Sequence, residues 1–189
     1  IDGVEADDVI GTLSTQAAAA GMSCVISTGD KDMAQLVEPL VKLVNTMNSE
    51  VLDEAGVVAK FGVTPAQIVD YLALIGDTVD NVPGVEKVGP KTAVKWLAQY
   101  GSLAAIVENA ADIGGAVGAN LVKHLDFLPL GKKLVTIVRD VPLPLAPHEL
   151  SPQEPDKAKL PALSPQYEFP GWPRALQHGK PPAPASSPS

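Results

Sequence analysis

The spacing of apolar residues predicts an α/β segment followed by a helical segment. Val9, Ile10, Leu13 and Ala17 recur at helical spacing, and Gly21 is expected to end that helix. Short apolar runs bounded by turn residues predict strands over 23–28, 41–45 and 50–52, the last at a sheet edge. A strand, an acidic loop and a resumed helical pattern over 33–37 together form the strand-to-helix step of an α/β domain.

Capping residues set the expected bounds of the helices that follow. Asp53 is a typical N-cap for a helix that reaches Phe61 and ends at Gly62. Thr64 and Pro65 begin the next helix, which Gly76 ends. Further helices are expected over 90–100, 102–109, 112–125 and 130–138.

The C-terminal segment has a different composition. Of the 18 prolines, 13 fall in the last 48 residues, so this segment is expected to form neither long helices nor central strands. A small aromatic group, residues 167–169 with Trp172, is expected to dock on the preceding domain. Residues 177–189 are expected to form a linker or a disordered tail.

Composition places the chain among globular proteins. Its 189 residues are 46% hydrophobic and 19% charged, enough for one full core or two small domains. The single cysteine, Cys24, excludes an internal disulfide and is expected to be a buried structural thiol. No signal peptide or membrane span is recognisable, which favours a cytoplasmic protein without a membrane partner.

The net charge of −8 is unevenly distributed. Residues 1–80 contain 13 acidic residues and 3 lysines, a net charge of −10. Residues 81–139 contain 4 acidic and 7 basic residues, a net charge of +3. An acidic segment that could bind cations therefore precedes a basic segment that could bind phosphates.

Seven carboxylates from three segments are candidate metal ligands. They are Glu5, Asp7, Asp8, Asp30, Asp32, Asp77 and Asp80. If the fold brings them together, their repulsion either raises their pKa values or requires cations, and a ligand set of oxygen atoms alone suits Mg²⁺ or Mn²⁺ rather than zinc. N-terminal capping for Asp7 and Asp8 and a solvated turn for Asp30 and Asp32 are the alternative interpretations. Asp70 is expected to face solvent or to support a ligand without being one.

A glycine hairpin follows the third acidic segment. Gly84 and Gly89 bound a tight turn between two helices and are expected where φ is positive or the backbone approaches a neighbour closely. The amides of Val88 and Gly89, at the start of the helix opened by Pro90, are expected to point toward an anion. Lys87, Lys91 and Lys95 add positive charge along one side, although an ordinary helical hairpin with solubilising lysines is the alternative.

Three motifs together resemble a known family in order and spacing. The motifs are residues 4–8 (VEADD), 27–32 (STGDKD), and 76–84 (GDTVDNVPG) with 88–93 (VGPKTA). They are similar to the 5′-3′ exonuclease domains of bacterial DNA polymerase I, which belong to the flap endonuclease family. The resemblance covers residues 1–140, and the aromatic group in the tail looks like the end of the same domain.

The resemblance implies a fold and an activity. It implies an α/β class fold, in which residues 1–62 are the C-terminal part of a PIN-like, parallel-sheet nuclease core. Residues 63–140 would be an all-α helix-hairpin-helix DNA-binding module, and residues 141–176 a partly docked Pro-rich segment. The implied activity is metal-dependent hydrolysis of 5′ flaps and nicked duplex in primer removal and repair, by a monomer joined to a C-terminal polymerase domain.

The resemblance also implies roles for particular residues. All seven carboxylates would be metal ligands, with Asp8, Asp30 and Asp77 catalytic. DNA contacts would come from the hairpin and the helix after it, namely from Gly84, Lys87, Val88, Gly89, Lys91, Thr92 and Lys95. A potassium ion would bind backbone carbonyls at Val85 and Val88.

The resemblance has one departure, at the front of the chain. The family's first strand with its leading aspartate and its basic helical gateway have no counterpart after position 1. The chain alone is therefore expected to be weakly active or inactive.

Two other function classes remain open on the sequence. A duplex-binding module would use the hairpin without catalysis. A Mg²⁺ phosphohydrolase of the haloacid dehalogenase type would use Asp30 and Asp32 after a strand, but Ala34 stands where that class has a threonine, and the hairpin is left without a role.

Overall fold

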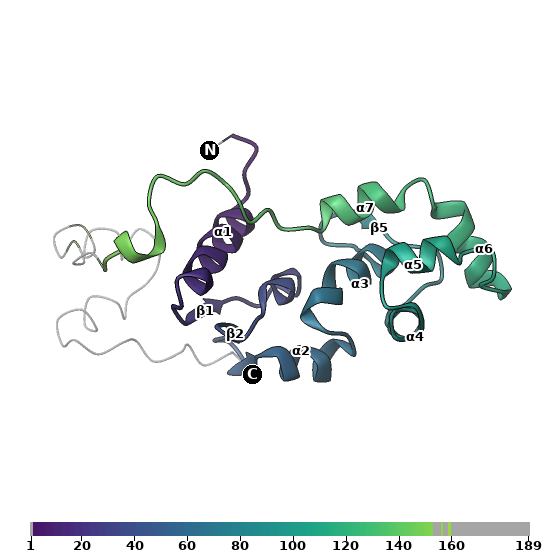
Figure 1. The fold of residues 1–189 in the computed structure, drawn as a ribbon, viewed down its shortest axis with the longest axis horizontal. Helices are drawn as coiled ribbons and strands as arrows, with labels where there is room; N and C mark the ends of the chain where they lie inside the picture. Colours follow the sequence, from purple (N-terminus) through teal and green to yellow (C-terminus); the bar gives the residue numbers. More distant parts are fainter. Residues whose placement is uncertain (1, 153–155, 157–158, 160–189) are drawn as a thin grey trace. The chain divides into compact units, whose positions relative to one another are not determined.

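The computed structural model describes residues 2–152, 156 and 159, and Figure 1 shows the fold. Residues 1–149 form one compact unit and residues 150–189 a second, and every element below lies in the first unit. The aromatic group at 167–172 lies outside the described residues, so its docking stays a prediction. Within the described part, no single helix is long and apolar enough to cross a membrane, and only the bent pair Glu54–Phe61 and Pro65–Ile75 passes that test jointly.

A three-stranded mixed sheet lies in the first third of the chain. Its strands, in the order β1-β2-β3, are β1 (Cys24–Ser27), β2 (Val41–Asn45) and β3 (Glu50–Leu52). β1 pairs with β2 in parallel, whereas β3 pairs antiparallel at the edge, with Leu43 opposite Leu52. The three predicted strands are confirmed, but the sheet is not purely parallel, because the short link between β2 and β3 allows only an antiparallel return.

Seven helices and three short 3₁₀ turns account for most of the remaining described residues. The helices are α1 (Ala6–Ala19), α2 (Glu54–Phe61), α3 (Ile68–Ile75), α4 (Pro90–Tyr100), α5 (Leu103–Glu108), α6 (Gly115–His124) and α7 (Leu128–Leu134). The 3₁₀ turns are η1 (Asp32–Leu36), η2 (Pro65–Gln67) and η3 (Pro147–Glu149).

Local caps explain why the bounds of α2 and α3 agree with prediction. The Asp53 side chain accepts a hydrogen bond of 2.8 Å from the Gly56 amide, and Gly62 ends α2 with φ of 76°. Thr64 and Gln67 form a capping box at η2, which leads directly into α3.

Two helices differ from their predicted ranges. α6 begins at Gly115 rather than at 112, because Gly115 has φ of 78°, a conformation that does not continue a helix. α7 ends at Leu134 rather than at 138, because the next residues leave the helix to bond to the α/β segment.

One hydrophobic core joins the two segments. Residues of the sheet region such as Val41 and Leu43 belong to the same buried cluster as Leu72 of α3 and Leu97 of α4. Cys24 packs against this cluster but is only partly buried, so the expected fully buried thiol is not observed; its partial burial raises the pKa of the thiol.

After α7 the chain returns to the α/β segment. Residues 135–141, called the return segment below, run back toward α1 in an extended path (Figure 1). The Val138 amide donates to Asp8 Oδ1 at 2.9 Å, and the Val141 amide donates to Thr12 Oγ1 at 3.1 Å. The return segment thus fixes the first half of α1, which carries Asp7 and Asp8.

The face of α1 under the return segment carries small residues. A Cβ at Gly11 would lie 2.6 Å from Ile137 Cγ2, so only glycine allows this approach. Thr12 and Ser14 are buried on the same helix, whereas Leu13 is only partly buried. The predicted apolar stripe was therefore only partly right for α1.

Candidate metal centre and nucleic-acid interface

A short hairpin after α3 positions two of the predicted ligands. Strands β4 (Gly76–Asp77) and β5 (Val82–Pro83) pair antiparallel, so Asp77 lies opposite Val82. Gly76 has φ of 76°, and Asn81 has φ of 55° within the turn. The sequence analysis missed this hairpin, although Asn81 was a usable signal because asparagine tolerates left-handed backbone.

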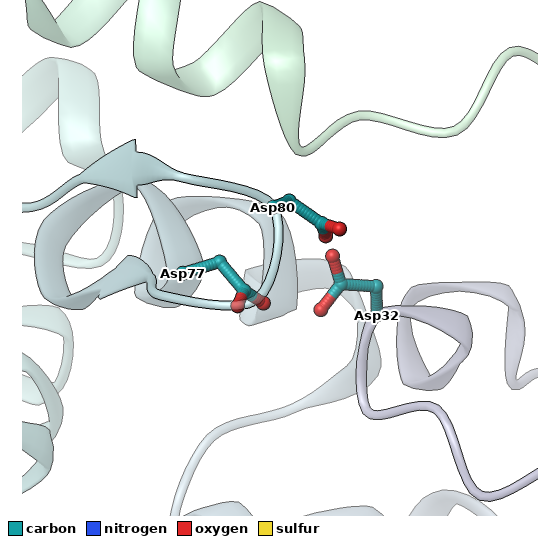
Figure 2. Close-up of side chains that lie close together, drawn as sticks. All are labelled: Asp32, Asp77 and Asp80. Atoms are coloured by element: carbon teal, nitrogen blue, oxygen red, sulfur yellow. The ribbon is translucent and has the colours of Figure 1, made fainter.

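Three carboxylates converge at the β4–β5 hairpin. Asp32, Asp77 and Asp80 each contribute an oxygen, and these oxygens all lie within 4.8 Å of one another. Figure 2 shows the three side chains pointing toward a common centre, two from the β4–β5 turn and one from η1. Asp32 and Asp77 are buried and Asp80 is exposed, so the cluster opens to solvent on the side of Asp80.

The loop after β1 sets the position of Asp32. The Asp30 amide donates to Thr28 Oγ1 at 3.0 Å, and Asp30 Oδ1 accepts from the Asp32 amide at 2.9 Å. This pair of side-chain to backbone bonds turns the chain at once into η1. Asp32 therefore faces the cluster because of bonds made by residues next to it in sequence.

The cluster fits a hard divalent cation. Asp32 Oδ1 is buried and has no hydrogen-bond partner among the described residues, although an isolated buried carboxylate oxygen is costly. Three converging carboxylates offer only oxygen ligands, which Mg²⁺ and Mn²⁺ prefer. A cation between them would supply the missing partner.

The electrostatics of the cluster are those of crowded anions. Burial, followed by the charges of Asp30 and Asp77, raises the pKa of Asp32 to about 7. Burial also opposes ionisation of Asp77, but the hydrogen bond and charge of Lys31, with the Val79 amide, bring its pKa below the usual value. Asp32 is thus only partly ionised near neutrality, whereas Asp77 stays ionised beside Lys31.

The other predicted ligands line the walls beside the cluster. Glu5, Asp7 and Asp8 share a cavity of about 250 Å³ with Asp32 and Asp80, and the return segment closes one side of it. Asp30 lines a neighbouring cavity of about 310 Å³ with Asp77 and Asp80. Asp80 borders both cavities.

Asp7 and Asp8 differ in their surroundings. Burial, followed by the charges of Asp30, Glu5, Asp8 and Asp80, raises the pKa of Asp7. Asp8 instead accepts backbone hydrogen bonds at both oxygens, from Glu5 at 3.2 Å and from Val138 at 2.9 Å. The seven acids therefore gather around two adjoining cavities, with Asp8 also serving as a structural acceptor.

The predicted glycine turn over residues 84–89, called the glycine hairpin below, lies between β5 and α4. Its details differ from expectation. Gly84 does not have positive φ; a Cβ there would lie 2.2 Å from the Ile75 carbonyl carbon, so close approach explains this glycine. Gly89 has φ of −105° and open space in front of it, and the left-handed position is taken by Lys87 with φ of 64°.

The prediction for the amide donors of the glycine hairpin was also partly wrong. The Val88 amide donates to the Val85 carbonyl at 3.0 Å, so it is not free for an anion as expected. The Gly89 amide has no hydrogen-bond partner within the part of the chain that the structure describes, and Gly89 precedes α4 as its N-cap. Gly89 rather than Val88 therefore offers the amide at this helix start.

The lysines around the hairpin are accessible. Lys87, Lys91 and Lys95 are all exposed, and the last two are one helical turn apart on α4. Thr92 donates its amide to the Gly89 carbonyl at 3.0 Å. The side chain of Asn120 on α6 donates to the Glu86 carbonyl at 2.8 Å and so holds the hairpin, a contact that sequence reasoning did not foresee.

The expectation that Asp70 faces solvent was wrong. Asp70 is buried; its Oδ2 accepts from the Leu103 amide at 2.9 Å and its Oδ1 lies 2.7 Å from Lys132 Nζ. These bonds join α3 to the start of α5 and to α7. Asp70 is therefore a structural residue of the helical segment, remote in role from the metal cluster.

Comparison with known proteins identifies the family. Residues 1–62 match the family model of the 5′-3′ exonuclease N-terminal resolvase-like domain, and residues 63–158 match that of the 5′-3′ exonuclease C-terminal SAM fold. The chain is 47% identical to DNA polymerase I of Pseudomonas aeruginosa over 180 residues, which are 91% of this chain and 20% of that protein. It is 42% identical to a 5′-3′ exonuclease of Aquifex aeolicus over 160 residues, 85% of this chain and 54% of that one.

Solved structures share the fold. The bacteriophage T5 5′-exonuclease with bound zinc ions aligns with a TM-score of 0.68 at 22% identity, over 73% of this chain and 52% of that chain. A T5 flap endonuclease in a pseudo-enzyme–product complex with DNA and metal ions aligns with a TM-score of 0.68 at 21% identity, with the same coverage. The chain spans about a fifth of the length of the DNA polymerase I relatives. With both domain models matched across residues 1–158, the chain belongs to the 5′-3′ exonuclease family.

Proposed function

We propose that this chain is the part of a DNA polymerase I that hydrolyses DNA phosphodiesters as a 5′-3′ exonuclease and flap endonuclease. The observation that carries the proposal is the convergence of Asp32, Asp77 and Asp80, with an Asp32 oxygen that is buried and has no hydrogen-bond partner among the described residues. The glycine hairpin with its exposed lysines belongs to the same unit. The proposed substrate is a 5′ flap or a nicked duplex, and the proposed neighbour is a polymerase segment of the same protein.

The acidic residues would hold Mg²⁺ or Mn²⁺. Asp32, Asp77 and Asp80 are the proposed direct ligands, and Glu5, Asp7, Asp8 and Asp30 would bind directly or through water from the cavity walls. Bound divalent ions supply Lewis-acid stabilisation of the charge that develops on a phosphodiester. Asp8, Asp30 and Asp77 remain the residues proposed as catalytic.

The residues around the hairpin would hold the DNA backbone. The Gly89 amide at the start of α4 has no hydrogen-bond partner among the described residues, and Lys87, Lys91 and Lys95 are exposed near it in sequence. Gly84 and Thr92 shape the turn and the first helical turn. These groups contact phosphates without reading bases, which suits a nuclease that recognises strand structure rather than sequence.

A potassium ion at the hairpin is part of the proposal. The Val85 carbonyl accepts from the Val88 amide with one lone pair, and its second lone pair is available to a cation. The proposed ligands are the carbonyls of Val85 and Val88, as in the family.

The experiment combines binding and cleavage. Mn²⁺ binding to this chain is measured by isothermal titration, and cleavage of a 5′-flap substrate is measured on the whole polymerase that contains it, for the wild type, Asp77→Asn and Asp126→Asn. Asp126 is exposed and outside the cluster, so its variant is the matched control. We expect Asp77→Asn to weaken Mn²⁺ binding and to abolish flap cleavage, with Asp126→Asn unchanged.

The duplex-binding module without catalysis is the outcome that would replace the proposal. In that case, duplex binding would depend on the lysines of the glycine hairpin. Flap cleavage by the whole polymerase would be unchanged in Asp77→Asn. The phosphohydrolase alternative is set aside, because the chain belongs to the exonuclease family and that alternative gives the hairpin no role.

A further inference from the structure

A lysine lies inside the acidic cluster. Lys31 forms an ion pair with Asp77 Oδ2, from a position in the loop between β1 and Asp32. Its side chain is 37% exposed, whereas that of Asp77 is 2% exposed, so the ammonium reaches from the surface down to a buried carboxylate. Among the ion pairs of the described residues, this is the one that involves a carboxylate of the cluster.

The ion pair uses the bonding capacity that a metal ion would need. Asp77 Oδ1 accepts from the Val79 amide at 2.8 Å, and Asp77 Oδ2 is held by Lys31. Each oxygen of Asp77 therefore has a partner, in contrast to Asp32 Oδ1 beside it, which has no partner among the described residues. A divalent ion that binds Asp77 through Oδ2 comes close to the Lys31 ammonium, and the repulsion between the two cations favours release of Lys31 from that oxygen.

The position of Lys31 permits such an exchange. It lines the open cavity that it shares with Asp30, Asp77 and Asp80, and the four methylenes of a lysine allow its ammonium to move away without a change in the backbone. A displaced ammonium would remain in a cavity rich in carboxylates, so its movement costs little solvation.

We propose that Lys31 is a built-in counter-ion that holds Asp77 in the metal-free protein and competes with divalent ions for that carboxylate. The inference rests on the proposed metal site. Lys31 would lower the affinity of the site and preserve the fold around the acids when no metal is bound.

The test compares Lys31→Met with Lys60→Met and Lys31→Arg. Lys60 forms a surface ion pair of 2.7 Å with Glu50, which is not one of the seven candidate ligands, and is the matched control. Mn²⁺ affinity is measured by isothermal titration, and the melting temperature is measured in EDTA and in Mn²⁺.

The expected result is opposite in the two readouts. Lys31→Met should bind Mn²⁺ roughly ten-fold more tightly, because the variant lacks a competing charge-assisted hydrogen bond to Asp77 that is worth about 1.5 kcal/mol. It should also melt at a lower temperature in EDTA and gain more from Mn²⁺. Lys31→Arg should keep the wild-type affinity, and Lys60→Met should change neither the affinity nor the gain.

The result that overturns the inference is Mn²⁺ affinity that is unchanged or weaker in Lys31→Met while the wild type binds normally. That result would leave the proposed function intact. If neither the wild type nor Lys31→Met binds Mn²⁺, both proposals fail. If only Lys31→Met binds Mn²⁺, the proposal that Lys31 competes with the metal for Asp77 is supported.

Discussion

Asp32 illustrates how a proposed metal ligand affects the stability of the metal-free protein. Its pKa is raised from 3.8 to about 7, first by burial and then by the charges of Asp30 and Asp77. Between these two pH values the folded protein binds more protons at this group than the unfolded chain does, so the free energy of unfolding falls as the pH rises. Above about pH 7 the full cost remains, unless a cation offsets it.

Asp32→Asn should therefore stabilise the metal-free protein, and more so at high pH. We expect the gain in unfolding free energy to be larger at pH 8 than at pH 5 by roughly 2–3 kcal/mol. Urea denaturation in EDTA at the two pH values measures this difference, with Asp126→Asn as the control. An equal gain at both pH values would contradict the prediction.

Two glycines of the hairpin should respond differently to alanine. A Cβ at Gly84 would lie 2.2 Å from the Ile75 carbonyl carbon and 2.4 Å from the Gly76 amide nitrogen, so backbone would have to move. We expect Gly84→Ala to cost about 3 kcal/mol or more of stability. Gly89→Ala, which meets nothing within 4 Å, should cost less than about 1 kcal/mol.

The glycine substitutions also distinguish an effect on stability from an effect on DNA binding. Gly89→Ala should keep its melting temperature close to that of the wild type but bind duplex DNA more weakly, because the new methyl group would crowd a phosphate that approaches this helix start. Thermal denaturation and fluorescence anisotropy with a labelled duplex measure the two effects. A large loss of stability in Gly89→Ala would show that its surroundings are not open.

Among elements, the return segment and η1 are joined by one buried side chain. Gln35 Nε2 donates to the Val135 carbonyl at 2.9 Å and to the Asp32 carbonyl at 3.0 Å, and Gln35 Oε1 accepts from the Ile137 amide at 3.0 Å. Both the amide nitrogen and the amide oxygen of Gln35 are thus bonded, to backbone groups of η1 and of the return segment. The bonds hold the backbone of a proposed metal ligand.

Gln35→Leu should destabilise the protein by about 3 kcal/mol, since it leaves three buried backbone groups without partners. Chemical denaturation measures the loss, and Gln99→Leu on the exposed side of α4 is the control, expected within about 0.5 kcal/mol. Mn²⁺ affinity of Gln35→Leu should also fall. Wild-type stability in Gln35→Leu would be inconsistent with the observed bonds.

The sequence predicted elements well where their signals are local. Asp53, Gly62 and Thr64 act on residues three or four positions away, so the bounds of α2 and the start of α3 followed from short stretches of chain. Asp70 and Gln35 were not foreseen, because their partners are 33 and about 100 positions away. Lys31 likewise bonds to a residue 46 positions along the chain.

In the whole molecule, charge is divided between the two segments. The net charge is −10 over residues 1–80 and +3 over residues 81–139, and the structure brings both into one compact unit. The carboxylate motifs could be recognised from sequence because their spacing is distinctive, but their grouping into two adjoining cavities depends on the fold. The return segment that closes one cavity carried no sequence signal.

This division predicts a salt dependence. If Lys87, Lys91 and Lys95 each neutralise a phosphate, their replacement by glutamine should weaken duplex binding and reduce the slope of log K against log salt by up to roughly 3. Anisotropy titrations from low to moderate salt measure the slope. Lys42→Gln, an exposed lysine of the acidic segment, should leave it unchanged.

The return segment also bears on how the protein is made. The Val138 amide bonds to a carboxylate 130 positions earlier, and the Val141 amide bonds to a hydroxyl 129 positions earlier. During synthesis, Asp8 leaves the ribosome long before the residue that fixes it, so the acidic pocket is completed only when nearly all of the compact unit has emerged. The acidic pocket of a nascent chain is therefore completed only after helices α2 to α7 have been synthesised.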